Sequence, residues 1–264
     1  MINPFNSFLD EFFTLLIEYK HSTNRLYKVL KKDVEIYSKE QAILHYMSRL
    51  VISDWTELSK NGWERNYNTG ISIETPKEAY KDEIDQLLSR EFCLIYAQCY
   101  EGFEKFIKDC LFNLASRNSN FYKFLISLTK NRKSIELNRN SMPSNRNLFK
   151  ALEKAGGQTF KQYSIVNNLN YNFKDVWFVL SESRHAITHS RSKLPKCKIS
   201  NSINQLTLLD LLFNSKHIDN NTISIELDIE KYERLIKRLS EYAFQIFKSL
   251  SIEEKFEWNI LLSN

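Results

Sequence analysis

Glycine and proline are scarce in this chain: 264 residues include 5 Gly and 4 Pro. Tight turns depend on these residue types, so a β-sandwich or barrel with many turns would need more of both. The scarcity predicts long regular elements joined by few tight turns. Hydrophobic residues make up 42% of the chain and aromatic residues 13%, which is enough for a packed core. We therefore expect an all-α fold built as one large domain with an appended part.

Paired cysteines and long apolar runs are also missing. The four cysteines, at positions 93, 99, 110 and 197, contain no CxxC pair, so we expect reduced and mostly buried thiols. The first apolar stretch is interrupted by Asp10 and Glu11, which does not fit a secretory signal peptide. No apolar run approaches the roughly 20 residues that a membrane span requires. These features predict a cytoplasmic protein without a membrane segment.

The charge balance is mildly basic, with a formal net charge of +5 and a pI near 8.8. This permits a nucleic-acid partner without requiring one. Residues 130–146 concentrate basic side chains and hold a single acid, Glu136. The basic positions are Lys130, Arg132, Lys133, Arg139 and Arg146. Two interpretations stay open, a surface loop and a segment that contacts the phosphates of a polyanion.

Apolar spacing divides the chain into two predicted parts. Residues 1–60 form an N-terminal helical extension, whose third helix starts at the capping box Ser38–Gln41 and runs to about residue 51. The turn signal Asn61-Gly62 and a polar segment end this part. Residues 75–264 then form a second helical domain.

The second part begins with the strongest helix start in the chain. Thr75 serves as N-cap, Pro76 as the first helical residue and Glu78 follows at the third position, which predicts a helix to about Ser116. Further helices are expected over 121–128, 148–155, 173–190, 206–213 and 228–247, with a short one opening at 251. Period-two alternation over 222–227 predicts one small β-hairpin with 198–200.

The helix expected over 173–190 carries the most informative stretch. Its first half is apolar, and its second half places Arg184, His185, Thr188 and His189 within about a turn and a half. Polar side chains at the end of an apolar helix cost free energy when they are buried without partners. This cluster therefore needs a structural or a chemical reason.

Two explanations do not involve RNA. Cationic side chains near a helix C-terminus interact favourably with the helix dipole, so the cluster can simply close the helix. His185 and His189, four residues apart, also have metal-ligand spacing. However, position 186 is Ala, where a zinc protease would have its catalytic Glu. His217 or Asp219 would have to complete such a site through folding, and we expect no metal and no cofactor.

The third explanation is metal-free phosphoryl transfer on RNA. That reaction needs a base for the 2′-hydroxyl proton, an acid for the leaving 5′-oxygen and a fixed cation for the phosphate. Histidine serves as acid or base near neutral pH, and arginine holds phosphate oxygens while staying charged. One chain supplies few such groups, so two-fold pairing of these helices would assemble a fuller site.

The hexapeptide from Arg184 to His189 resembles the R-polar-x-x-x-H motif of the HEPN superfamily, the higher eukaryotes and prokaryotes nucleotide-binding domains. The stretch Tyr100–Asp109 also resembles the aromatic and acidic helix that precedes this motif in several such families. The resemblance covers roughly residues 76–250, and its specific part is six residues long. It implies an all-α helical bundle of HEPN type.

The same resemblance implies a metal-independent endoribonuclease that acts as a homodimer with a composite active site. Arg184 would bind the scissile phosphate, His189 would be the acid and base, and His185 would orient or supplement it. Glu104 or Glu101 would supply an acidic group from the preceding helix. Relatives serve as toxins or effectors in prokaryotic antiviral defence that cleave tRNA or other RNA, with a regulatory or antitoxin partner. The alternative is a non-catalytic RNA-binding or regulatory module of the same fold.

Overall fold

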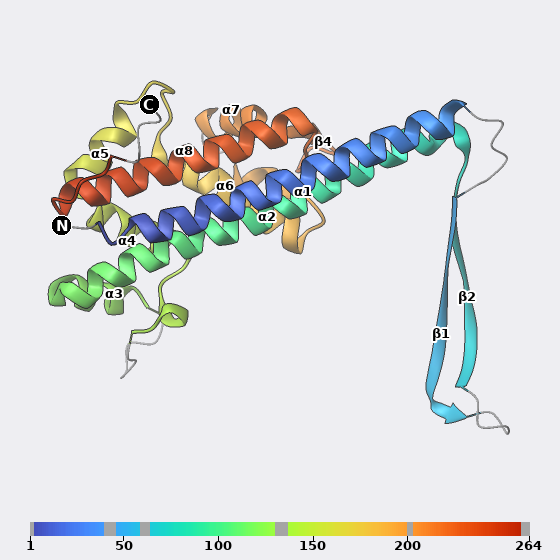
Figure 1. Cartoon of the computed structure of the whole chain (residues 1–264), viewed down its shortest axis with the longest axis horizontal. Helices are drawn as coiled ribbons and strands as arrows, with labels where there is room; N and C mark the ends of the chain where they lie inside the picture. Colours follow the sequence, from blue (N-terminus) through green and yellow to red (C-terminus); the bar gives the residue numbers. More distant parts are fainter. Residues whose placement is uncertain (1–2, 40–45, 59–63, 130–136, 200–202, 260–264) are drawn as a thin grey trace. The chain divides into compact units, whose positions relative to one another are not determined.

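The computed structural model describes residues 3–39, 46–58, 64–129, 137–199 and 203–259. Over these residues the chain is mostly helical, with two small antiparallel sheets (Figure 1). The sheets make the fold less purely helical than the sequence predicted. None of the described helices is long and apolar enough to cross a membrane.

The helices and strands follow one another along the chain with these bounds. The longer helices are α1 (Asn6–Lys39), α2 (Lys77–Arg117), α6 (Phe173–His189) and α8 (Ile229–Glu253). The shorter helices are α3 (Ser119–Leu128), α4 (Asn145–Ala155), α5 (Gly157–Ile165) and α7 (Ile203–Leu212). The strands are β1 (Tyr46–Leu58), β2 (Glu64–Thr75), β3 (Lys193–Pro195), β4 (Asn214–His217) and β5 (Thr222–Glu226).

The chain divides into two compact units. The first unit contains residues 1–23 and 89–264, and the second contains residues 24–88. Both boundaries fall inside long helices, α1 and α2. The second unit therefore holds the hairpin of β1 and β2 together with one end of each of these helices.

The core of the first unit is organised around Phe103 on α2. Its ring lies 6.0 Å from Phe12 on α1, 6.0 Å from Trp177 on α6 and 5.5 Å from Tyr242 on α8, centroid to centroid. In this unit α1, α2 and α8 run side by side (Figure 1). The neighbouring Gly102 permits close approach, because a Cβ there would lie 2.3 Å from the side chain of Leu15.

Most helices predicted from apolar spacing and capping residues are confirmed. The side chain of Asn172 accepts a hydrogen bond from the Lys174 backbone amide at 2.9 Å and starts α6. That of Asp228 accepts one from the Lys231 amide at 2.8 Å and starts α8. The helix predicted from Thr75 begins at Lys77, slightly later than expected. Local signals were sufficient for α6 and α8 because each of them buries its apolar residues at regular helical spacing.

The third N-terminal helix, predicted from residue 38 to about 51, is wrong. Residues from Tyr46 to Leu58 form β1, which pairs with β2 in the segment expected to be a polar connection. Gln41, half of the supposed capping box, lies outside the described residues. Short apolar runs satisfy helical and strand spacing equally well, and here the partner strand decided.

The small sheet near the C-terminus also differs from its prediction. Strand β5 is confirmed, but it lies between β3 and β4 in a three-stranded sheet rather than pairing with 198–200. Lys196–Lys198 form a short 3-10 helix instead. The helix predicted to open at Ser251 is wrong as well, because α8 runs on to Glu253 and includes that residue.

Candidate active site

Helix α6 positions the Arg-His cluster by burying its other side. Trp177 packs against Phe103 at 6.0 Å and Phe149 at 5.5 Å between ring centroids. The Tyr96 hydroxyl donates a hydrogen bond of 2.8 Å to the backbone carbonyl of Leu180. These contacts fix the rotation and height of the helix, which in turn directs the side chain of Arg184.

Arg184 meets an acidic partner from α2. Its Nη2 lies 3.4 Å from Oε2 of Glu104, a residue 80 positions earlier in the chain. The Glu104 side chain is 9% exposed and that of Arg184 is 22% exposed. The guanidinium also lies 5.7 Å from the centre of the Tyr100 ring. Sequence reasoning left Glu101 and Glu104 open; Glu101 is exposed, and it is Glu104 that reaches Arg184.

The ion pair is incompletely satisfied. Nε of Arg184 and Oε1 of Glu104 are buried and have no hydrogen-bond partner among the described residues. Buried polar atoms normally find partners, since leaving them unpaired costs about 1–3 kcal/mol each. Burial raises the pKa of the nearby Tyr100 hydroxyl, and the Glu104 carboxylate raises it further. Arg184 therefore has an N–H group, at Nε, that makes no hydrogen bond to the described residues.

The two histidines lie together on the exposed side of α6. The rings of His185 and His189 are 4.8 Å apart between centroids and inclined by 51°. Both residues are exposed, whereas Ala186 and Ile187 between them are buried. Two imidazoles at this separation can address the same bound group.

The end of α6 is held by the following turn. Ser190 and Ser192 both donate backbone hydrogen bonds to the carbonyl of Ala186, at 2.9 and 3.0 Å. Arg191 and Ser192 adopt positive φ angles of 50° and 61°. The Ser192 carbonyl then accepts from the amide of Ile225 on β5 at 2.9 Å. This turn anchors the helix end, and His189 with it, to the three-stranded sheet.

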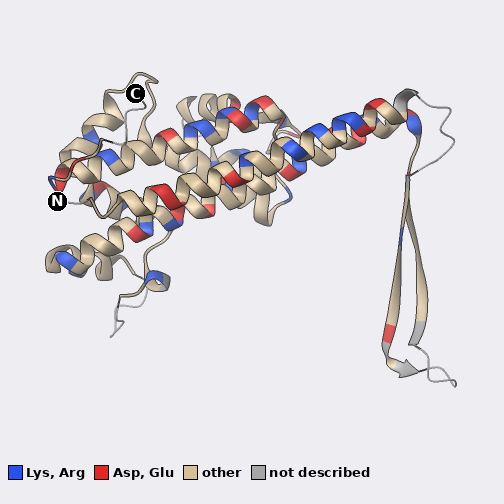
Figure 2. Cartoon of the chain, viewed as in Figure 1, with Lys and Arg blue, Asp and Glu red and all other residues tan. Residues whose placement is uncertain are grey.

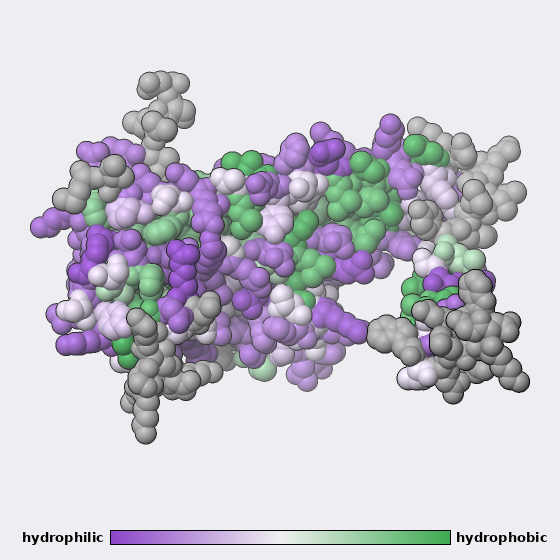
Figure 3. Space-filling view, turned by 60° about the horizontal axis from the view of Figure 1, so that its bottom comes forward, coloured by the Kyte–Doolittle hydropathy of each residue, from purple (hydrophilic) through white to green (hydrophobic). Residues whose placement is uncertain are grey.

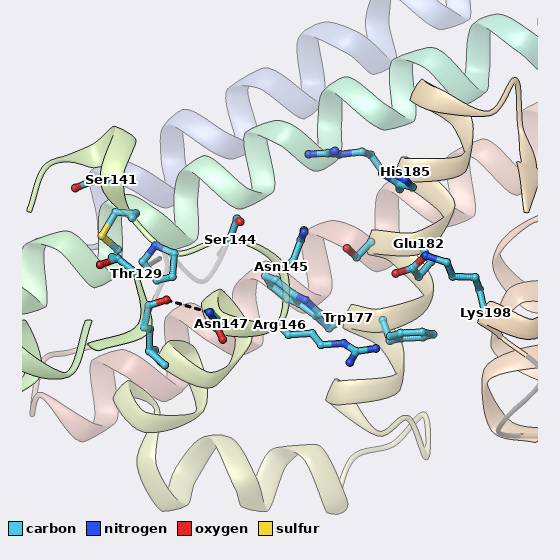
Figure 4. A pocket seen from close by; sticks show the side chains of 16 residues that line it. Thr129, Ser141, Ser144, Asn145, Arg146, Asn147, Trp177, Glu182, His185 and Lys198 are labelled. Carbon is cyan, nitrogen blue, oxygen red and sulfur yellow. Dashed lines mark hydrogen bonds and ion pairs between the residues drawn. The ribbon is translucent and has the colours of Figure 1, made fainter. Parts of the chain in front are cut away.

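A pocket of about 680 Å³ opens beside the motif (Figure 4). His185 and Glu182 on α6 face Thr129 and Ser141 across it, as the close-up shows. Arg184 lines the same pocket, whereas His189 does not. The motif is therefore split, with two of its residues at the pocket and the third beside His185.

The pocket wall opposite α6 contains the start of α4. Ser144, Asn145 and Arg146 line it, and the Ser144 side chain makes no capping hydrogen bond. Backbone N–H groups at a helix N-terminus favour bound phosphate. Together with Arg146 and Arg184, this wall suits an anionic ligand.

The basic segment contributes to this wall only in part. Arg146 lines the pocket, while Arg139 forms an ion pair with the buried Asp109, with Nε and Oδ1 2.9 Å apart. The positions Lys130, Arg132 and Lys133 lie outside the described residues. The segment is thus partly anchored to α2 and partly turned to the pocket.

Sequence reasoning missed two charged residues at the site. Glu182 and Lys198 both line the pocket and form an ion pair of 3.4 Å. Glu182 lies two residues before Arg184, so its place in the polar half of α6 was a usable signal. Lys198 could not be recognised from the sequence, because only the turn after α6 brings it close to Glu182.

Metal-binding and thiol chemistry find little support in the described residues. No group of three His, Cys, Asp or Glu side chains that could hold a metal occurs in the ranges given above. Burial raises the pKa of Cys93 and Cys99 to about 12, which makes both thiols poor nucleophiles. Cys110 is also buried, and Cys197 is exposed; all four cysteines are free, as expected.

Comparison of the chain with models of protein families, with curated proteins and with solved structures finds no match.

Proposed function

We propose that this protein is a metal-independent endoribonuclease. The observation that carries the proposal is the position of Arg184, which is backed by Glu104 and lines one pocket with His185 and the start of α4. The resemblance of its motif to that of the HEPN superfamily points to the same chemistry. The site combines a fixed cation and two imidazoles beside the N-terminal end of a helix, groups that suit RNA cleavage without metal.

In the proposed reaction the RNA supplies its own nucleophile. A histidine takes the proton of a 2′-hydroxyl, the 2′-oxygen attacks the adjacent phosphorus, and the bond from phosphorus to the 5′-oxygen breaks. An acid protonates the leaving 5′-oxygen. The products end in a 2′,3′-cyclic phosphate and a 5′-hydroxyl. Arg184 balances the added charge on the phosphate, His189 exchanges protons, and His185 orients or supplements it.

We further propose that two copies complete the active site. Arg184 and His185 line the pocket, while His189 lies beside His185 without lining it, so one chain brings a single histidine into the pocket with Arg184. A second copy can supply the missing histidine to each pocket through a two-fold arrangement. By the same resemblance, the substrate is tRNA or another cellular RNA. The biological role is that of a toxin or effector in antiviral defence, restrained by a regulatory partner.

The direct test is cleavage of a labelled RNA in the presence of EDTA. We expect products with 2′,3′-cyclic phosphate ends, and a loss of about 10²–10⁴-fold in rate for His189→Ala. His21→Ala, at an exposed position on α1, is the matched control and should cleave normally. Full activity of His189→Ala would sink the proposal, and tight binding with intact RNA would favour the non-catalytic alternative.

Complementation tests the composite site. Arg184→Ala and His189→Ala are each inactive alone, but a mixed dimer contains one pocket with both native residues if these come from different chains. An equal mixture should then regain about a quarter of the native rate. No recovery in a mixture shown to exchange subunits would assign both residues to the same chain.

A further inference from the structure

Strands β1 and β2 form a two-stranded sheet of their own in the second unit (Figure 1). Strand β1 has 13 residues and β2 has 12, which is long for a hairpin. A two-stranded ribbon alone in water is marginally stable at best. Such a ribbon needs a further surface to pack against.

The strand register sorts the ribbon into an apolar and a polar face. Residues opposite one another share a face, and Ser48 pairs with Ile73 while Ile52 pairs with Tyr67. The extra residues at the register shift belong to β2, near Gly70, so the alternation along β1 is undisturbed. We define the apolar face as Leu50, Ile52, Tyr67, Ile71 and Ile73.

The polar face carries the intervening positions. Arg49 lies opposite Ser72, and Val51 lies opposite Asn68. Ser53 and Asn66 continue this face, and their side chains share a hydrogen bond of 2.7 Å. Met47 and Val51 are apolar exceptions on this face, and Asp54 is an acidic exception on the other, so the ribbon is amphipathic mainly in its middle part.

The apolar face is open to solvent. Its five side chains belong to residues that are between 46% and 66% exposed. Hydrophobic residues are visible on the ribbon beside hydrophilic ones (Figure 3). These exposed fractions correspond to an apolar area on the order of 500 Å², which is at the upper end of the patches that monomers expose.

Charge argues against RNA as the occupant. Among the side chains that the structure describes on the two strands, one is basic, Arg49, and two are acidic, Asp54 and Glu74. Few charged positions appear along the ribbon compared with the long helices (Figure 2). This excess of negative charge would repel a polyanion such as RNA, whereas an uncharged apolar surface could pack on the ribbon.

We propose that the protein self-associates through this hairpin, with the apolar face of one copy packed on the same face of a second copy. Two ribbons stacked face to face at about 10 Å form a two-layer β structure that buries all five side chains. A two-fold arrangement makes the face its own complement. The five side chains supply the centre of such a contact, and their neighbours on the same face would bring it toward the roughly 800 Å² per partner of stable interfaces. The hairpin is proposed as the main contact that holds two copies together, in addition to the pairing at the active site, and this contact does not require RNA cleavage.

The test uses neighbouring positions on opposite faces. Ile52 and Val51 are 51% and 55% exposed. Ile52→Lys and Val51→Lys therefore introduce the same charge at similarly exposed positions on opposite faces of the ribbon. Sedimentation of the full chain should show a dimer at micromolar concentration. Ile52→Lys should raise the dissociation constant at least tenfold, and Val51→Lys should leave it within a few-fold.

Cross-linking covers the case in which Ile52→Lys disturbs the hairpin. The exposed Cys197 is first replaced by Ser, leaving three buried cysteines. A bis-maleimide reaching about 10 Å should then join Ile52→Cys chains into dimers and leave Val51→Cys chains single. A native protein that is monomeric at about 100 µM, an equal response of both lysine variants, or equal cross-linking would each overturn the proposal.

Discussion

Two buried carboxylates on α2, five residues apart, meet an arginine in different ways. Asp109 is 4% exposed. Its Oδ1 lies 2.9 Å from Nε of Arg139, and its Oδ2 lies 3.8 Å from Nζ of Lys105. Glu104 is similarly buried, yet it pairs with Arg184 at 3.4 Å, and both partners keep an unpaired buried atom. The first pair is satisfied and anchors a loop. The second is incomplete, and its arginine lines a pocket, which is why we propose that it binds a ligand.

The largest expected difference between the pairs is in catalysis. Arg184→Ala removes the cation proposed to stabilise the phosphate, and we expect RNA cleavage to fall about 10²–10³-fold. Arg139→Ala, which removes an arginine that is 61% exposed, should change the rate only a few-fold. Single-turnover cleavage of one labelled RNA measures both. Equal losses would show that the two pairs do not differ in function.

The next effect is on stability. Glu104→Gln leaves the half-buried guanidinium of Arg184 without its counter-charge, so we expect the free energy of unfolding to fall by about 1–3 kcal/mol. Asp109→Asn loses an ion pair whose arginine is exposed, which is worth about 1 kcal/mol or less. Urea denaturation of the two variants gives the comparison. A larger loss for Asp109→Asn would reverse our ranking of the pairs.

A double-mutant cycle isolates the Glu104–Arg184 interaction itself. Glu104→Gln, Arg184→Met and the combined variant should show a coupling of about 1–2 kcal/mol in the free energy of unfolding. The combined variant should be nearly as stable as the better single variant, because neither buried charge is then left alone. Strict additivity would mean that the 3.4 Å pair contributes nothing.

The smallest effect concerns pH. Burial raises the pKa of Asp109 above its ordinary 3.8, while Arg139 and Lys105 partly offset this. The native state therefore binds the proton more tightly than the unfolded chain does. Its contribution to stability is full below 3.8 and is lost as the pH rises through the native pKa. Relative to Asp109→Asn, the native protein should gain stability between pH 7 and pH 4. A relative loss over that range would contradict the sign.

Helix α6 shows how much of the site was predictable. Its apolar run, its Asn172 cap and its polar end are local features, and the structure confirms the helix almost residue for residue. The sequence did not decide whether Glu101 or Glu104 is the acidic partner of Arg184, because the choice depends on how α2 is rotated against α6. The second pocket wall, made by Thr129 and residues 141–147, was not predictable, since these residues carry no shared pattern.

The hairpin shows where local reading fails. Residues 46–51 have apolar spacing that suits a helix, and a capping box appeared to start it. Pairing with residues 68–75 makes them a strand, because backbone hydrogen bonds to a partner outweigh a weak local preference. Low glycine and proline content correctly indicated long elements, but it did not indicate that two of these elements would be strands.

By itself, the sequence determined the long helices α2, α6 and α8, the free thiols and the place of Arg184, His185 and His189 at the end of one helix, because each follows from short-range spacing. Tertiary structure decided that Glu104 rather than Glu101 meets Arg184 and that His189 lies outside the pocket. It also decided that residues 46–58 are a strand. These outcomes depend on packing between segments far apart in the chain, which local patterns do not encode.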